Sequence, residues 1–159
     1  MTSKVPQLID WLVAAFTASP NLGAATPPVA VYDGPVTTAA NDKLLLWVGL
    51  QDPDNPGASE AATFEQSRGD MGLTGRDEIS VIRCTAEAWS GLDDVRTARV
   101  AAFAISAAAE AVIRADATRF GGNAQAMPGV TGGVLLQNNV QGAGGVARVT
   151  FDVIFRSFT

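Results

Sequence analysis

The residue types that carry most protein chemistry are scarce in this chain of 159 residues. Histidine, the commonest general base and metal ligand, does not occur, so the single cysteine, Cys84, has no histidine to act as its base. Cys84 lies among alternating apolar residues, which predicts a buried thiol and not a reactive one. The sequence therefore offers no pair of a nucleophile and a base.

Acidic residues occur together at three places. Asp77 and Glu78 are adjacent at the start of an expected strand, and Asp93 and Asp94 are adjacent at the start of an expected helix. Adjacent side chains on a strand point apart, and acids before a helix act as caps. The acidic turn at 51–57 lacks the spacing and the distal glutamate of a calcium loop, which predicts a solvated turn. We expect no enzyme activity, no catalytic residue, no cofactor and no metal.

Two features of nucleotide- and nucleic-acid-binding proteins are missing. The glycine cluster Gly142, Gly144, Gly145 sits between expected strands and is not followed by Lys-Ser/Thr, so it predicts a hairpin loop and not a phosphate-binding loop. The net charge of −5 gives no sign of a basic surface. Nucleic acid is therefore not an expected primary ligand, although DNA that only passes through a channel needs no basic wall.

The longest helical pattern lies between Gly91 and Gly122. Asp93 or Asp94 can cap its first turn, and the pair Gly121-Gly122 is a stop signal. Because its apolar face is made mostly of alanine, the helix can lie close against a sheet. That face consists of Val95, Ala98, Ala102, Ile105, Ala109 and Val112.

The remaining patterns predict one more helix and several strands. An amphipathic helix is expected at about residues 4–18, with Leu8, Trp11, Leu12, Ala15 and Phe16 on one face. Strands are expected at 29–32, 44–50 (buried on both faces), 78–89, 134–136 and 146–155. Residues 58–77 alternate near Phe64 and then contain three glycines, which we interpret as a long two-stranded arm whose tip is mobile in isolation.

Together these elements predict one α+β domain over residues 1–159. Its mixed, mostly antiparallel β-sheet carries two helices packed on one face. Two strands have a second face that is half polar, at Val81 to Trp89 and at Arg148 to Arg156. The face of the sheet away from the helices is therefore expected to be solvated or covered by a neighbouring molecule.

A succession of short motifs resembles the tail terminator proteins of long-tailed (siphovirus-type) bacteriophages, particularly those carried by phages of actinobacteria. Each motif is short, and the resemblance lies in their order along most of the chain. The motifs are the amphipathic N-terminal helix, Val31-Tyr32-Asp33-Gly34-Pro35, Gly75-Arg76-Asp77-Glu78, Ala86-Glu87-Ala88-Trp89-Ser90-Gly91, the arginine-bearing long helix, and Ala147-Arg148-Val149-Thr150-Phe151.

The resemblance implies a structural virion protein of the head-proximal end of the tail, assembled in the host cytoplasm. Members of this family form a hexameric ring that caps the tail tube, ends its polymerisation and joins the tail to the head-neck connector. The implied partners are further copies of the chain, the tail tube protein and a neck, stopper or head-completion protein. DNA passes through the lumen without sequence-specific binding, and no membrane is involved. The alternative is another neck component, a head-completion adaptor or stopper, and a third possibility is an enzyme or small-ligand module.

Under this resemblance, large or charged side chains on the arm and beside the long helix become candidates for the oligomer or tube interface. The alternatives are that Phe64 is tucked into its own domain, that Trp89 lies at the edge of the core, and that Arg96 and Arg99 form a solvated face. The candidates are Phe64, Arg68, Met71, Leu73, Trp89, Arg96 and Arg99.

Overall fold

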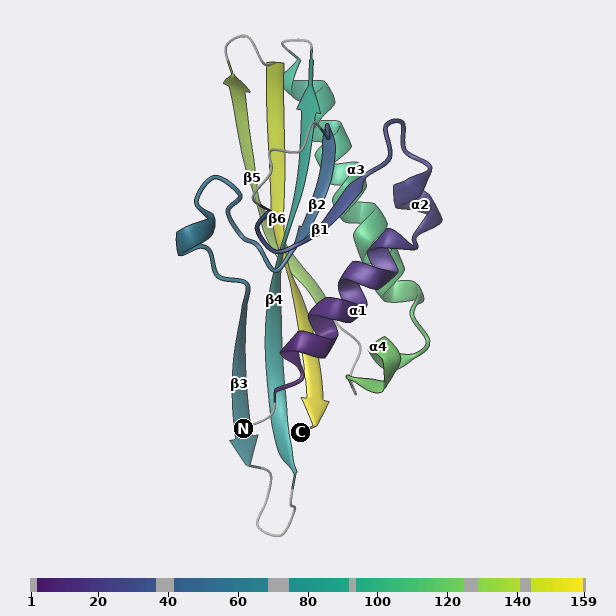
Figure 1. The fold of residues 1–159 in the computed structure, drawn as a ribbon, viewed down its shortest axis with the longest axis vertical. Helices are drawn as coiled ribbons and strands as arrows, with labels where there is room; N and C mark the ends of the chain where they lie inside the picture. Colours follow the sequence, from purple (N-terminus) through teal and green to yellow (C-terminus); the bar gives the residue numbers. More distant parts are fainter. Residues whose placement is uncertain are drawn as a thin grey trace.

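The computed structural model describes residues 3–36, 42–68, 75–91, 94–124, 129–140 and 144–158. Within them lie six strands and four α-helices, two of them long, which confirms the predicted α+β fold with a mixed, mostly antiparallel sheet (Figure 1). The helices are α1 (Val5–Thr17), α2 (Pro20–Gly23), α3 (Val95–Ala115) and α4 (Arg119–Gly122). The strands are β1 (Ala30–Asp33), β2 (Leu44–Val48), β3 (Ala62–Arg68), β4 (Arg76–Ser90), β5 (Gly129–Val140) and β6 (Gly144–Phe158), and a short 3₁₀ helix, η1, spans Pro56–Ala58.

Strand β4 organises the sheet, whose order is β1-β2-β4-β6-β5 with β3 also paired to β4. One edge of β4 is shared: its first half pairs with β3 and its second half with β2. The other edge pairs with β6 from Asp77↔Phe158 to Ser90↔Gly145. Only β1 and β2 run parallel. The sheet is therefore long and narrow. Its lower part has three strands, β3, β4 and β6, as far as Asp77, and the ends of β3 and β4 extend beyond β6 as a two-stranded arm (Figure 1).

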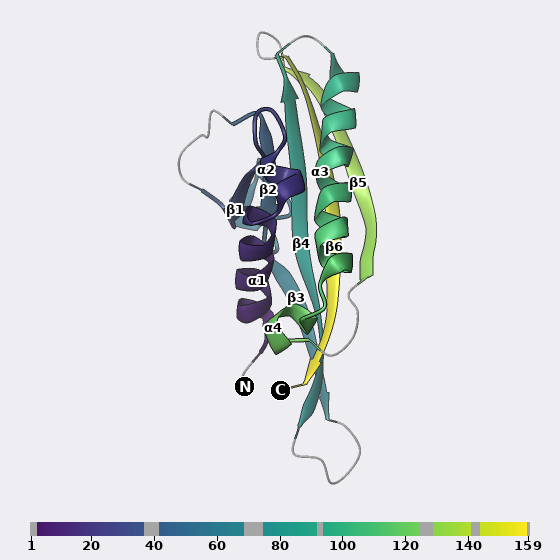
Figure 2. The ribbon, with the colours of Figure 1, turned by 90° about the vertical axis from the view of Figure 1, so that its right-hand side faces the viewer.

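The helices cover one face of the sheet (Figure 2). As predicted, Ile82, Cys84, Ala86 and Ala88 of β4 face the core and are fully buried. They pack with apolar side chains of the long helices, β2 and β6: Leu8, Leu12, Phe16, Leu46, Val48, Ala98, Ala102, Ile105, Ala109, Ile113, Ala147, Val149, Phe151, Val153 and Phe155. Where alanines of α3 meet Ala88 and Ala147, the helix lies on small side chains, as the alanine stripe predicted.

The predicted limits of the long helix are correct at its start and wrong at its end. Asp94 is the N-cap, and its carboxylate accepts hydrogen bonds from the backbone amides of Arg96 and Thr97. The helix ends at Ala115 and not at the glycine pair, because Asp116 accepts from the amides of Thr118 and Phe120 and turns the chain. Phe120 then packs edge-on against Trp11 and Phe155.

Two strand predictions were also incomplete. The strand expected at 134–136 runs over Gly129–Val140, with an irregularity between Thr131 and Gly133, because β6 offers a partner along this whole length. In the glycine cluster expected to form a hairpin loop, Gly144 and Gly145 belong to β6. Gly144 has a φ of +93°, and a Cβ there would lie 1.9 Å from the carbonyl oxygen of Ser90. This glycine is therefore required by a close approach of two chain segments.

Replacing Gly144 with alanine should destabilise the protein by about 1–3 kcal/mol, because the new Cβ adds both backbone strain and overlap with Ser90. Chemical denaturation of the Gly144→Ala variant measures the loss. Gly57→Ala is the matched control, since no atom lies within 4 Å of a Cβ at Gly57. Equal stability of the two variants would contradict the proposed packing.

Candidate assembly interface

The arm expected at residues 58–77 has two paired strands in its described part. Ala62 to Arg68 of β3 pairs with Arg76 to Ile82 of β4 in antiparallel register. The far part of this pair lies beyond the main body (Figure 1). The predicted interface residues Met71 and Leu73 fall outside the described residues.

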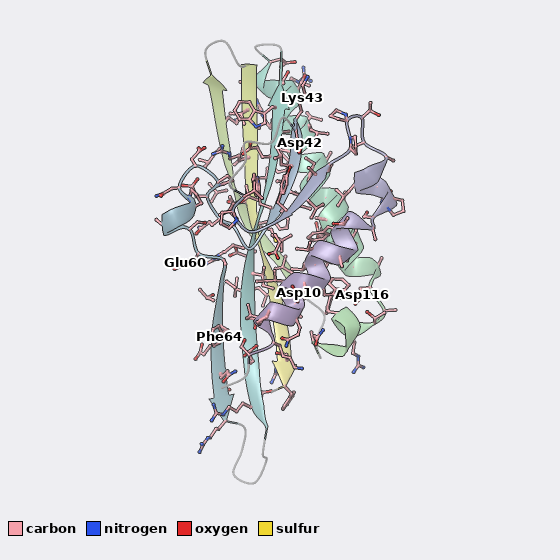
Figure 3. All side chains as sticks on the ribbon, viewed as in Figure 1. Asp10, Asp42, Lys43, Glu60, Phe64 and Asp116 are labelled. Carbon is pink, nitrogen blue, oxygen red and sulfur yellow. The ribbon has the colours of Figure 1, made fainter. Side chains whose placement is uncertain are left out.

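One face of the arm carries two of the predicted interface residues. Phe64 projects from β3 (Figure 3) and is 50% exposed, so it is not tucked into its own domain. Arg68 stands opposite Arg76 in the register, and Phe64 stands opposite Ser80. Because directly opposite side chains share a face, Phe64, Arg68 and Arg76 lie on the side of the arm that faces α1. Neither arginine makes an ion pair with another described residue.

A buried carboxylate fastens the arm to α1. Glu78 is fully buried, and its Oε1 accepts from Ser3 Oγ at 3.0 Å, the Lys4 amide at 2.9 Å and Ser80 Oγ at 3.1 Å. Its Oε2 accepts from Gln66 Nε2 at 2.6 Å. Burial opposes the charge of this carboxylate, yet the hydrogen bonds outweigh burial and hold the pKa of Glu78 below its ordinary value of 4.5. The carboxylate therefore joins β3, β4 and the start of α1.

The face of the sheet away from the helices is half polar, as predicted, but the chain itself covers part of it. Arg148 of β6 forms ion pairs with Glu87 of β4 and with Asp54 of the segment between β2 and β3. Burial disfavours the charge of Arg148, but the hydrogen bonds that it donates to these two carboxylates, and their negative charges, raise its pKa above the ordinary value. Thr85 Oγ1 lies 2.9 Å from the carbonyl oxygens of both Leu50 and Gln51. The 51–59 loop is thus fixed over β4 and β6 by polar contacts.

Between this loop and the sheet lies a groove with a volume of about 340 Å³. Val134 and Leu136 of β5 form an apolar wall and are 58% and 53% exposed. The remaining lining is mostly polar and comes from the loop and β6: Gln51, Asp52, Pro53, Asn55, Ala58, Ser59, Arg148 and Thr150. Below we call this cavity the β5 groove.

The other predicted interface residues lie apart from the arm. Trp89 is half-buried, donates from Nε1 to the Glu87 carboxylate and packs against Leu45 and Trp47 on the face away from the helices. Arg96 and Arg99 are exposed on α3 and make no ion pair with a described residue. The structure thus brings Phe64 and Arg68 together and leaves Trp89 and the α3 arginines on other surfaces.

Three features of this region were not identified from the sequence. The pairing of Arg148 with Glu87 follows from the register of β4 and β6, in which these residues are directly opposite. The sequence showed the alternation of polar and apolar residues within each strand, but it did not show which residues of β4 and β6 are paired. The exposed Val134 and Leu136 and the opposition of Arg68 and Arg76 likewise depend on pairing between segments distant in sequence.

Comparison with known proteins gives no relationship for this chain: no protein-family model matches the sequence, and no curated protein matches it significantly.

Within the described ranges, no three His, Cys, Asp or Glu side chains gather as a metal site would require. No described helix is long and apolar enough to cross a membrane.

Glu78→Gln should lower the free energy of unfolding by about 1–3 kcal/mol at pH 7, because an amide cannot replace a carboxylate that accepts from every neighbour. Since the folded-state pKa of Glu78 lies below 4.5, the wild-type advantage is present above that pH and shrinks as the pH falls below it. Urea denaturation from pH 3 to pH 7 measures this dependence. The control is Glu65→Gln, which changes an exposed carboxylate on the same arm. A pH-independent difference between wild type and Glu78→Gln would show that the charge is not involved.

Arg148→Met should cost about 3–5 kcal/mol, because Glu87, only 5% exposed, would remain as a buried charge without its partner. Arg114→Met is the matched control. Arg114 pairs with Glu110 one helical turn away on the exposed side of α3, an interaction worth about 0.2–0.5 kcal/mol. If thermal unfolding shows equal losses for both variants, Arg148 does not hold the loop as described.

Proposed function

We propose that this chain is a structural virion protein that forms a hexameric ring on the head-proximal end of a phage tail tube. In this role it ends tube polymerisation and joins the tail to the head-neck connector. It works through surfaces that bind other proteins and has no catalytic centre or cofactor. The proposal rests on the resemblance of its motifs and on the surfaces that the fold presents.

The strand motifs behind the resemblance lie in β1, at one edge of the sheet, and in the neighbouring strands β4 and β6. Val31 to Pro35 lies at the end of β1, and Gly75 to Glu78 opens β4. Ala86 to Gly91 closes β4, and Ala147 to Phe151 lies within β6, its paired neighbour. The motifs of β4 and β6 are thus distant in sequence but adjacent in the sheet, as expected if the order of the motifs along the chain encodes one fold.

The single observation that carries the proposal is the two-stranded arm. A ring is built from heterologous contacts, in which two different surfaces of each subunit meet. The far end of the arm extends past β6, and nearer the body the β3–β4 pair exposes Phe64 on one face and Ile79, 52% exposed, on the other. Large apolar side chains on an exposed strand pair are stabilised when a second protein covers them.

A further surface suited to assembly lies on α3. Its outward side exposes Val100 and Phe103, with Arg96 and Arg99 near the start of the helix. Positive side chains near a helix N-terminus do not favour the helix, because that end of the dipole is itself positive. Their placement is consistent with a role in contacting a neighbouring subunit or neck protein.

The charge of the chain agrees with a channel for DNA. With a net charge of −5 per copy, six copies repel phosphate and do not retain the passing duplex. The proposed partners are accordingly copies of the chain, tube protein and neck protein, with DNA in the lumen.

Tube assembly in the presence of the protein tests the proposal. Purified protein is mixed with polymerising phage tail-tube protein, and negative-stain images give the length distribution and the appearance of both tube ends. We expect sixfold rings, shorter tubes and density at one end only. Bovine serum albumin at equal concentration controls for nonspecific effects on polymerisation.

Unchanged tube length with bare ends would contradict the proposal. In that case, binding to portal-side proteins would favour the alternative neck component, a head-completion adaptor or stopper.

A further inference from the structure

We propose that the arm of one copy binds the β5 groove of a second copy, with Phe64 against Val134 and Leu136, and Arg68 and Arg76 beside the acidic loop. The inference rests on the proposed ring and names the contact that would build it. Three observations support it: an unsatisfied arm, a preformed acidic groove and the separation of the two within one chain.

The arm has features that the described part of its own chain does not satisfy. Arg68 and Arg76 are directly opposite, and like charges in this position destabilise a strand pair. Neither has an acidic partner among the described residues, and Phe64 leaves half of its surface in water on the same face. A partner surface that is acidic and has an apolar wall would offset both the repulsion between the two arginines and the exposure of Phe64 to water.

The β5 groove offers an apolar surface and an acidic residue that complement Phe64 and the arginines of the arm. Its apolar wall is Val134 and Leu136, and Asp52 lies in its lining. Arg148 also lines the groove, but its charge is paired with Asp54 and Glu87, so Asp52 is the lining charge that an arginine of the arm would meet. Ser59 Oγ accepts from the amides of Gln51 and Asp52 at 2.8 and 2.9 Å, so the loop is fixed before any partner arrives. A preformed site loses little conformational entropy on binding.

The two surfaces cannot meet within one molecule. Phe64 and Arg68 lie on the side of the sheet that faces α1, whereas the groove lies beside η1 and β5 on the side away from the helices. Folding the arm back would break the pairing of β3 with β4 and the Glu78 contacts. A second copy supplies the groove without this loss, and since the contact joins two different surfaces, it can close a ring.

Crosslinking tests the contact directly. A Phe64→Cys protein is mixed with an Asn55→Cys protein and a short bismaleimide, because Asn55 lines the groove. The native Cys84 does not interfere, since it is fully buried and burial raises the pKa of its thiol to about 12. The control replaces Phe64→Cys with Arg119→Cys on the exposed part of α4. We expect crosslinked heterodimer from the arm and groove pair, several times more than from the control.

Charge reversal tests the same contact in solution. Arg68→Glu and Asp52→Lys should each weaken self-association at least about tenfold in sedimentation experiments, and a chain carrying both changes should recover most of the loss. Arg119→Glu controls for the change in net charge and should leave self-association unchanged. Melting temperatures show whether each variant is folded, which matters for Asp52 because its carboxylate accepts from the Asp54 amide.

The outcomes separate this inference from the proposed function. If the wild-type protein caps tubes but gives no heterodimer above the control and no recovery in the double variant, the arm-to-groove contact is wrong and the function stands. If the contact forms but tubes grow to normal length, the contact stands and the proposed function is wrong.

Discussion

The antiparallel pairing of β4 with β6 is the constraint on which the rest of the structure depends. It runs over almost the full length of both strands, from Asp77↔Phe158 to Ser90↔Gly145. Because side chains alternate along each strand, this single register places Cys84 and Phe151 on the helix side, and Arg148 beside Glu87 on the other side. A shift by one residue would bury the arginine in the core, so apolar packing and ion pairing select the same register.

The length of β4 also creates the arm. β2 pairs with only its second half, which leaves this edge of the first half free to pair with β3, while β6 pairs with the other edge as far as Asp77. Glu78 lies within the half that pairs with β3, opposite Gln66, where it ties the β3–β4 pair to the start of α1. The β3–β4 pair is therefore fastened to the body at Glu78 and exposes Phe64 and Ile79, a combination suited to binding another protein with little loss of entropy.

Much of this architecture was predictable from local patterns. The alternation of Ile82 to Ala88, the amphipathic face around Leu12 and the capping acid Asp94 each follow from one segment of sequence, and each is confirmed. The end of α3 was not predictable from the glycine pair, because Asp116 turns the chain earlier and Phe120, which follows this turn, packs against residues far away in sequence. For the same reason, the sequence predicted Phe64 and Arg68 as interface residues but not Arg76, Val134 or Leu136, whose roles depend on register.

The most direct test of the account is cryo-electron microscopy of tail tubes assembled with this protein, at a resolution that traces strands. The account predicts six copies at one end of the tube, each with its β3–β4 arm against a neighbouring subunit. Copies distributed along the tube wall, or ends that lack this chain altogether, would contradict it.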